Sequence, residues 1–207
     1  MFFCMLEVME RERADIVNCL ISKTSAAAVH PLQSVKKDRL KVKVYKDPLK
    51  AFMEERRIQT GSYARLYKKK LLEGIRFEPK VRYEDIPFAV QVMNKAKSLA
   101  LVSEPLYFYF QHPESFIHQP FTEEKARDYF KVMRLVWEYC QKNCPERMCV
   151  VRRFILNSRF KMLTNQTVRR QKDKDIQRRI FDLVQTNVRE MYQKKMLSYE
   201  GLKLKHK

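Results

Sequence analysis

The segment GSYARLYKKKLLEGIRFEPKVRYEDIPF, residues Gly61–Phe88, decides how this chain is interpreted. It contains an aromatic and basic block, a Gly-Ile-Arg-Phe turn and the adjacent acids Glu84 and Asp85, with basic residues on both sides. Two adjacent carboxylates just ahead of a helix, predicted over 86–97, can supply a general base. The alternative is that Asp85 caps this helix and Glu84 is a solvated neighbour.

Outward from this segment, the apolar pattern predicts alternating helices and strands up to about residue 118. Asp47-Pro48 is a typical helix start, with an N-cap followed by proline at the first helical position. Tyr63–Leu72 is predicted to be a short helix closed by Gly74. The other expected elements are a helix over 2–13, a buried strand over 15–21, a loop over 22–38, a half-exposed strand over 39–45, a helix over 48–57, and strands over 99–102 and 106–110.

From residue 119 onward the pattern becomes helical. Thr122 is a predicted N-cap, with Glu123 and Glu124 in the first turn where negative charge is favourable. Further helices are predicted over 145–163 and 175–192, followed by a basic tail over 194–207. The predicted organisation is therefore an α/β domain over 1–118 and a helical region over 119–207.

The composition restricts the classes of partner. The chain has 207 residues, with 43 Lys and Arg against 24 Asp and Glu, which gives a formal net charge of +19. A polyanionic partner is consistent with this charge, whether nucleic acid, an anionic membrane surface or a phosphorylated substrate. A solvated basic helical surface would carry the same charge. With only three glycines, the chain cannot form a glycine-rich phosphate loop of the dinucleotide or Walker type.

The cysteines and the apolar runs predict a location. The five cysteines have no disulfide-framework or zinc-site spacing, which favours free thiols in a reducing compartment. The first apolar run ends at Glu7, too early for a secretory signal, and no run is long enough to span a bilayer. We expect a cytoplasmic protein, resting at most on the inner face of a membrane.

Several other motifs have both a functional and a structural interpretation. Asp173-Lys174-Asp175 spells a metal-binding Asp-x-Asp, but the surrounding cations favour helix-start acids. His112 and His118 have the spacing of a loop metal or phosphate site, or they are packing residues. The aromatic run over 107–110 would stack on a base or sugar, or form a strand buried on both faces. Lys68–Lys70 is predicted to be the exposed face of a helix.

Taken in order, these blocks resemble the acceptor-side half of bacterial family 2 glycosyltransferases that build surface polysaccharides. The resemblance covers about residues 10–140, and it rests most on the Arg76-Phe77 turn followed by Glu84-Asp85. The other blocks that carry it are Ala14–Val17, Tyr63–Lys68, Leu71–Phe77, Tyr83–Phe88 and Leu106–Ser115.

The resemblance implies a GT-A fold and inverting transfer from a nucleotide sugar to a glycan or lipid-linked acceptor. It implies that Asp85 is the general base, that Glu84 lines the acceptor site, and that a divalent metal, manganese or magnesium, takes part. Tyr63, Arg65, Tyr67 and Lys68 are expected to bind the acceptor, and His112 is a candidate metal ligand. The nucleotide-binding strands and their Asp-x-Asp are expected before Ala14, so this chain would correspond to a truncated enzyme.

Two functional hypotheses follow. The first is a glycosyltransferase, or its acceptor half, at the cytosolic membrane face, where the basic helical region meets anionic lipid. The second is a non-enzymatic basic module that binds nucleic acid or an anionic surface. It predicts nucleic-acid binding whose affinity falls steeply with salt concentration and is unchanged by Asp85→Asn.

Overall fold

The computed structural model describes residues 1–24, 40–111, 115, 119–194 and 196, and the chain forms two compact units. The first, here called the sheet unit, comprises Met1–Phe77 and Phe88–His118. The second, the helical unit, comprises Glu78–Pro87 and Gln119–Lys207. The chain is mixed α/β, as predicted, and the segment with the acidic pair belongs to the helical unit. The predicted loop over 22–38 lies largely outside the described residues.

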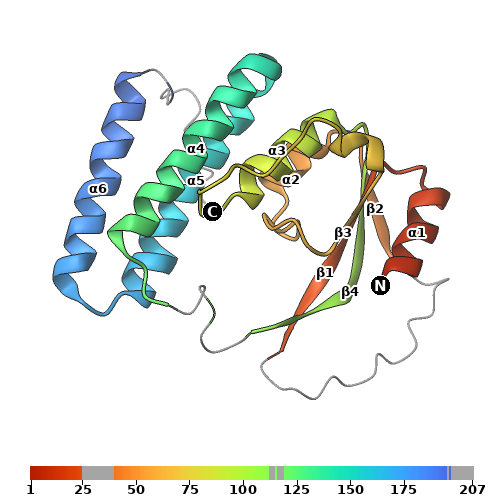
Figure 1. Ribbon diagram of the computed structural model, residues 1–207, viewed down its shortest axis with the longest axis horizontal. Coiled ribbons are helices and arrows are strands. Elements are labelled where there is room, and N and C mark those ends of the chain that lie inside the picture. Colours follow the sequence, from red (N-terminus) through yellow and green to blue (C-terminus); the bar gives the residue numbers. More distant parts are fainter. Residues whose placement is uncertain (25–39, 112–114, 116–118, 195, 197–207) are drawn as a thin grey trace, which may run out of the picture. The chain divides into compact units, whose positions relative to one another are not determined.

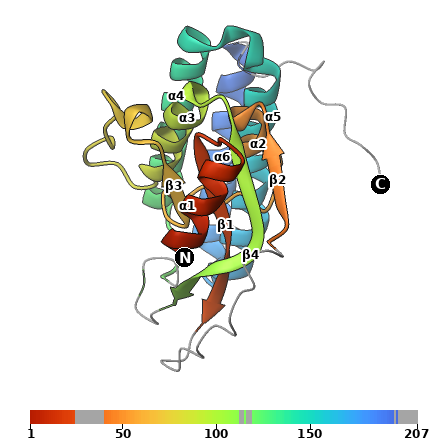
Figure 2. The ribbon, with the colours of Figure 1, turned by 90° about the vertical axis from the view of Figure 1, so that its right-hand side faces the viewer.

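The sheet unit is built on four strands in the order β2-β4-β1-β3 (Figure 1). The central strands β1 (Ile16–Thr24) and β4 (Leu99–Phe110) are parallel neighbours, and Figure 2 shows them side by side. The edge strands β2 (Val42–Tyr45) and β3 (Arg65–Tyr67) run antiparallel to them. The first four residues of both central strands are fully buried, which explains their nearly continuous apolar sequence.

Helices cover both faces of this sheet (Figure 1). On one face, α1 (Phe2–Arg11) packs Met5, Val8 and Met9 against core residues of the strands, with the spacing of one helical stripe. On the other face lie α2 (Pro48–Glu54) and the greater part of α3 (Asp85–Lys95). The predicted cap of α2 is confirmed, because the Asp47 carboxylate accepts a hydrogen bond from the Lys50 amide at 3.1 Å.

The helix predicted over Tyr63–Leu72 is wrong. Arg65–Tyr67 forms strand β3, and only Lys69–Leu72 is helical, as a 3-10 turn. The three strand residues pair with Ile16, Val17 and Asn18 of β1, so the free sheet edge provides backbone partners that local helix propensity cannot match. Gly74, the expected helix stop, has a positive φ of 74° just after the 3-10 turn.

The two strands predicted over 99–102 and 106–110 are one continuous strand, β4. The break that the sequence suggested, around Pro105, is instead a pair of register shifts opposite Leu20 of β1. The second half of β4 is not buried on both faces, contrary to the structural interpretation of the aromatic run. Phe108 is 36% exposed and Phe110 50% exposed, because beyond Leu106 alternate side chains leave the core.

The helical unit contains α4 (Glu123–Asn143), α5 (Met148–Lys161) and α6 (Lys174–Gln193). Thr122 caps α4 as predicted, accepting a hydrogen bond from the Lys125 amide at 3.3 Å. The single helix predicted over 145–163 is divided into a 3-10 turn at Pro145–Arg147, α5, and a π-helical segment at Met162–Val168. One core cluster of the unit is formed by Phe121, Ala126, Met162, Ile180 and Val184.

Candidate active site

The acidic pair lies where a turn enters α3. Glu84 is the last residue of the turn and Asp85 is the first residue of the helix, so Asp85 is in the first helical turn rather than at the N-cap. Both side chains are half-buried. Within the described part of the chain, neither carboxylate makes a hydrogen bond or an ion pair. Both are therefore available to an external proton donor.

The turn before the pair has an unusual backbone. Lys80 and Tyr83 have positive φ values of 54° and 66°, a region that residues other than glycine seldom adopt. The Ile86 amide donates a hydrogen bond to the Tyr83 carbonyl at 3.1 Å, which closes a turn whose two central residues are the acids. Strained residues of this kind persist only where the surrounding structure fixes them.

Side chains of α4 supply that constraint inside the helical unit. The Arg82 guanidinium contacts the Glu124 and Asp128 carboxylates at 2.7 and 2.6 Å. The Tyr83 ring packs edge-on against the Tyr129 ring, with centroids 5.1 Å apart. Burial, together with the neighbouring Tyr129 and Asp128, raises the pKa of Tyr83 to about 12, so its phenol stays neutral. The α4 contacts thus hold the two residues that directly precede the acidic pair.

The residues predicted to bind the acceptor lie in the sheet unit. Tyr63 stacks on two aromatic residues of β4, Tyr107 at 5.5 Å and Tyr109 at 5.4 Å between ring centroids. The structure therefore joins the Tyr63 block and the aromatic strand into one feature, which we call the tyrosine platform. A β-carbon on Gly61 would lie 2.4 Å from the Tyr63 ring, so only glycine leaves room for this ring position.

Arg65 lies beneath this loop rather than at the surface. The residue is 6% exposed, and its guanidinium donates hydrogen bonds to Asn18 Oδ1 and to the Gly61 carbonyl, each at 2.8 Å, and to the Gln59 carbonyl. It also lies 5.5 Å from the centre of the Phe52 ring. Arg65 therefore ties the loop that carries Tyr63 to strand β1.

Tyr67 and Lys68 have partners of their own. The Tyr67 hydroxyl donates to the Ser62 carbonyl at 3.2 Å, and Lys68 Nζ contacts Asp15 Oδ1 at 2.9 Å. Burial opposes ionisation of Asp15, but hydrogen bonds from Lys68 and the Lys97 amide, and the charges of Lys68 and Lys70, hold its pKa below the ordinary value. Lys69 and Lys70 are exposed, as predicted, although they lie in a 3-10 turn rather than an α-helix.

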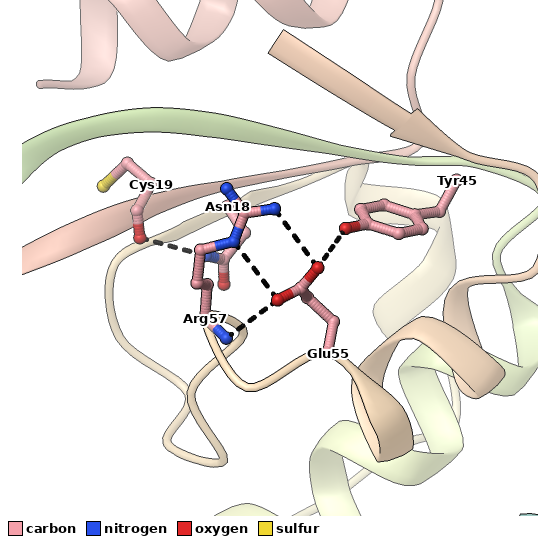
Figure 3. Close-up of polar contacts among 5 residues, drawn as sticks. All are labelled: Asn18, Cys19, Tyr45, Glu55 and Arg57. Atoms are coloured by element: carbon pink, nitrogen blue, oxygen red, sulfur yellow. Dashed lines mark hydrogen bonds and ion pairs between the residues drawn. The ribbon is translucent and has the colours of Figure 1, made fainter. Parts of the chain in front are cut away.

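The sequence analysis missed a second polar cluster in the sheet unit, shown in Figure 3. The Tyr45 hydroxyl donates to Glu55 Oε2 at 2.6 Å, and the Arg57 guanidinium contacts both oxygens of the same carboxylate at 3.2 Å. The hydrogen bonds from Arg57 and Tyr45 lower the pKa of Glu55 to about 2. The only signal in the sequence was an acid two residues before an arginine, which is too common a pattern to indicate a site.

The candidate metal residues gain no support. His112 and His118 lie outside the described residues. Asp173 caps α6, since its carboxylate accepts hydrogen bonds from the Asp175 and Ile176 amides at 2.9 and 3.1 Å, which confirms the helix-start interpretation. Across the described ranges, no group of three or more His, Cys, Asp and Glu side chains is placed to hold a metal ion.

Comparison with known protein structures shows which fold this chain resembles. The chain is similar to two crystal structures of S. aureus TarS residues 1–349. One, in complex with UDP, has a TM-score of 0.53 and 15% identity over 82% of this chain and 46% of that chain. The other, in complex with UDP-GlcNAc, has a TM-score of 0.58 and 14% identity, and the match covers 94% of this chain and 63% of that chain. The fold is thus similar to that of a glycosyltransferase domain.

The chain spans 46% and 63% of the two TarS chains that it matches. No protein-family model matches the sequence, and no curated protein matches it. None of the helices in the described ranges combines the length and the apolar character needed to cross a membrane. The roles of the individual site residues stay predictions.

Proposed function

We propose that this chain is the acceptor side of a glycosyltransferase, which transfers a sugar from a nucleotide sugar to a glycan or a lipid-linked acceptor. The observation that carries the proposal is the Glu84-Asp85 pair, two half-buried carboxylates without partners in the described part of the chain, in a glycosyltransferase-like fold. The ligands of the TarS structures, UDP and UDP-GlcNAc, support a nucleotide sugar as the donor.

In this proposal Asp85 is the general base. Its carboxylate takes the proton from the acceptor hydroxyl as the hydroxyl oxygen attacks the anomeric carbon of the donor sugar. The bond from that carbon to the diphosphate oxygen breaks, and the nucleoside diphosphate leaves with the electron pair, so the configuration inverts. Glu84 lines the acceptor site, where its carboxylate accepts a hydrogen bond from a second acceptor hydroxyl.

The tyrosine platform gives the acceptor a surface in the sheet unit. Tyr63, Tyr107 and Tyr109 are each half-buried, so they offer ring faces and edges without losing their mutual stacking. The apolar faces of sugar rings pack on aromatic rings of this kind. Arg65 bonds to the Gly61 and Gln59 carbonyls of the loop that carries Tyr63. The Tyr67 hydroxyl donates to the Ser62 carbonyl of the loop that carries Tyr63. Lys68 pairs with Asp15 at the other end of β1, and in the proposal it contributes positive charge toward an acceptor phosphate.

The resemblance implies a divalent metal, manganese or magnesium, which would neutralise the leaving diphosphate when bound. The described residues do not provide a set of three ligands for such an ion. The proposal therefore assigns no step to a metal held by these residues, and the roles of Asp85 and Glu84 do not depend on one.

Because the chain is proposed to be the acceptor side only, the test joins it to the nucleotide-binding half of a glycosyltransferase and compares this protein with its Asp85→Asn variant. The transfer assay uses UDP-GlcNAc as the first donor and lipid and glycan extracts as acceptors. Loss of a general base typically lowers the rate by about 10²–10⁴-fold, and we expect a loss of this size in kcat. Glu84→Gln should act mainly on the acceptor KM. Asp182→Asn, which removes an exposed acid of α6, is the matched control and should keep full activity.

A panel of UDP-, GDP- and dTDP-sugars extends the test to other donors. The proposal fails if the joined protein transfers none of these sugars and the chain alone binds no glycan or lipid-linked acceptor. It also fails if Asp85→Asn transfers sugar at the rate of the unmodified chain.

A further inference from the structure

Helix α6 has a second face that its own unit does not use. Ile180, Val184 and Met191 are buried and hold the helix on the core of the helical unit. Beside this buried face, about a quarter turn around the helix, Phe181 is 54% exposed and Tyr192 is 58% exposed. Tyr192 follows Phe181 by eleven positions, which is about three helical turns. The two side chains therefore differ by only about 20° in direction around the helix axis.

Basic residues accompany both aromatic side chains. Arg178 precedes Phe181 by three residues and Arg189 precedes Tyr192 by three residues, so each arginine lies one turn from an exposed ring. Lys174 lies on the same stripe, one further turn before Arg178. On a regular helix Glu190 points away from these residues, whereas Asp175 and Asp182 lie at their edge, on the side of Arg189. We call the face formed by Lys174, Arg178, Phe181, Arg189 and Tyr192 the α6 stripe.

We propose that the α6 stripe docks on an anionic lipid surface. The five side chains lie within about 80° of one another around the helix, so they can face a flat headgroup layer together. There the Phe181 ring enters the apolar boundary, and the Tyr192 ring sits with its hydroxyl among the headgroups. Lys174, Arg178 and Arg189 contact lipid phosphates, and the net charge of +19 attracts the chain to such a surface.

A lipid surface explains the stripe better than nucleic acid does. An exposed phenylalanine has no polar atom to pair with a phosphate, and on a nucleic acid it would need an unpaired base on which to stack. A membrane takes up the same ring without any partner of defined shape. This inference concerns where the chain binds and does not depend on sugar transfer, so its failure would leave the proposed function standing.

The experiment measures binding of the full chain to phosphatidylcholine vesicles with and without one quarter phosphatidylglycerol, by sedimentation at 100 mM NaCl. We expect binding only to the anionic vesicles. Arg178→Gln with Arg189→Gln should weaken it by about fivefold per charge, and Phe181→Ala by about tenfold. The matched control, Arg127→Gln with Arg134→Gln, removes two exposed charges of α4 and should weaken binding less.

A second measurement does not depend on the stability of these variants. Phe181→Trp places an indole in the stripe, and brominated lipid should quench its fluorescence while leaving the buried Trp137 unaffected. Equal binding to neutral and anionic vesicles would overturn the proposal. So would equal weakening by the α4 control, an unquenched indole at position 181, or binding to single-stranded RNA that is tighter than binding to the anionic vesicles.

Discussion

Replacing Arg65 by alanine tests whether this residue supports the fold or faces a ligand. In the structure its guanidinium reaches Asn18 Oδ1, the Gly61 carbonyl and the Gln59 carbonyl, and the residue is almost completely buried. Alanine leaves these three acceptors without their donor and removes the contact with Phe52. Hydrogen bonds from a charged donor contribute about 1.5–3 kcal/mol each, and an acceptor left buried without a partner costs about 1–3 kcal/mol.

These contributions are not additive, because water and loop movement satisfy part of the loss. We therefore expect Arg65→Ala to lower the free energy of unfolding by about 3–5 kcal/mol, the range seen when one partner of a buried charged contact is removed. Arg65→Lys keeps the charge but not the planar set of donors, so it should lose about 2 kcal/mol. Such losses are large beside a typical total stability of about 5–15 kcal/mol.

The assay is urea unfolding followed by far-ultraviolet circular dichroism, with hydrogen exchange of the Gly61–Tyr67 amides as a local readout. A double-mutant cycle with Asn18→Ala should give a coupling energy of about 1–2 kcal/mol, since the two side chains share one hydrogen bond. Lys69→Ala, an exposed neighbour, serves as the control and should leave the curve unchanged. A stability of Arg65→Ala within about 0.5 kcal/mol of the parent would refute the structural role and favour the acceptor-binding role predicted from the sequence.

Two further predictions concern the sheet unit. Hydrogen bonds from Arg57 and Tyr45 lower the pKa of Glu55 from an ordinary 4.5 to about 2, so the stability from these contacts is present above about pH 4.5 and is lost as the pH falls toward 2. In Glu55→Gln, the urea concentration at the unfolding midpoint should therefore depend less on pH between these values. An unchanged pH dependence would contradict the assignment. Gly61→Ala should displace the Tyr63 ring and weaken its stacking on Tyr107 and Tyr109. The acceptor KM should then rise with little change in kcat. An unshifted Tyr63 ring in a crystal structure of the variant would count against this reasoning.

Elements with strong local signals were predictable from the sequence. The Asp47-Pro48 start of α2 and the Thr122 start of α4 depend on one side chain bonding to an amide three residues away, so the sequence contains the whole interaction. The alternation of Val42 and Val44 with basic residues likewise indicates the half-buried face of β2.

Elements set by distant partners were not predictable. Strand β3 forms because Arg65–Tyr67 pairs with the free edge of β1, nearly fifty residues earlier in the chain. The sequence of the segment itself does not predict this pairing. The cluster of Tyr45, Glu55 and Arg57 also depends on how β2 and the end of α2 meet. The helix start beside Glu84 and Asp85 was predicted, but the turn before it was not, because positive φ values at Lys80 and Tyr83 are not expected for residues other than glycine.

The contacts of that turn change what the helical region contributes to the proposed chemistry. Residues 78–87 belong to the helical unit, where Arg82 pairs with Glu124 and Asp128 and Tyr83 packs on Tyr129. Arg82 forms these ion pairs with acids of α4, and within the described residues neither Glu84 nor Asp85 makes a salt bridge that would weaken a base. In the proposed enzyme, α4 is therefore a positioning element for the general base, because it holds the strained turn that presents Asp85.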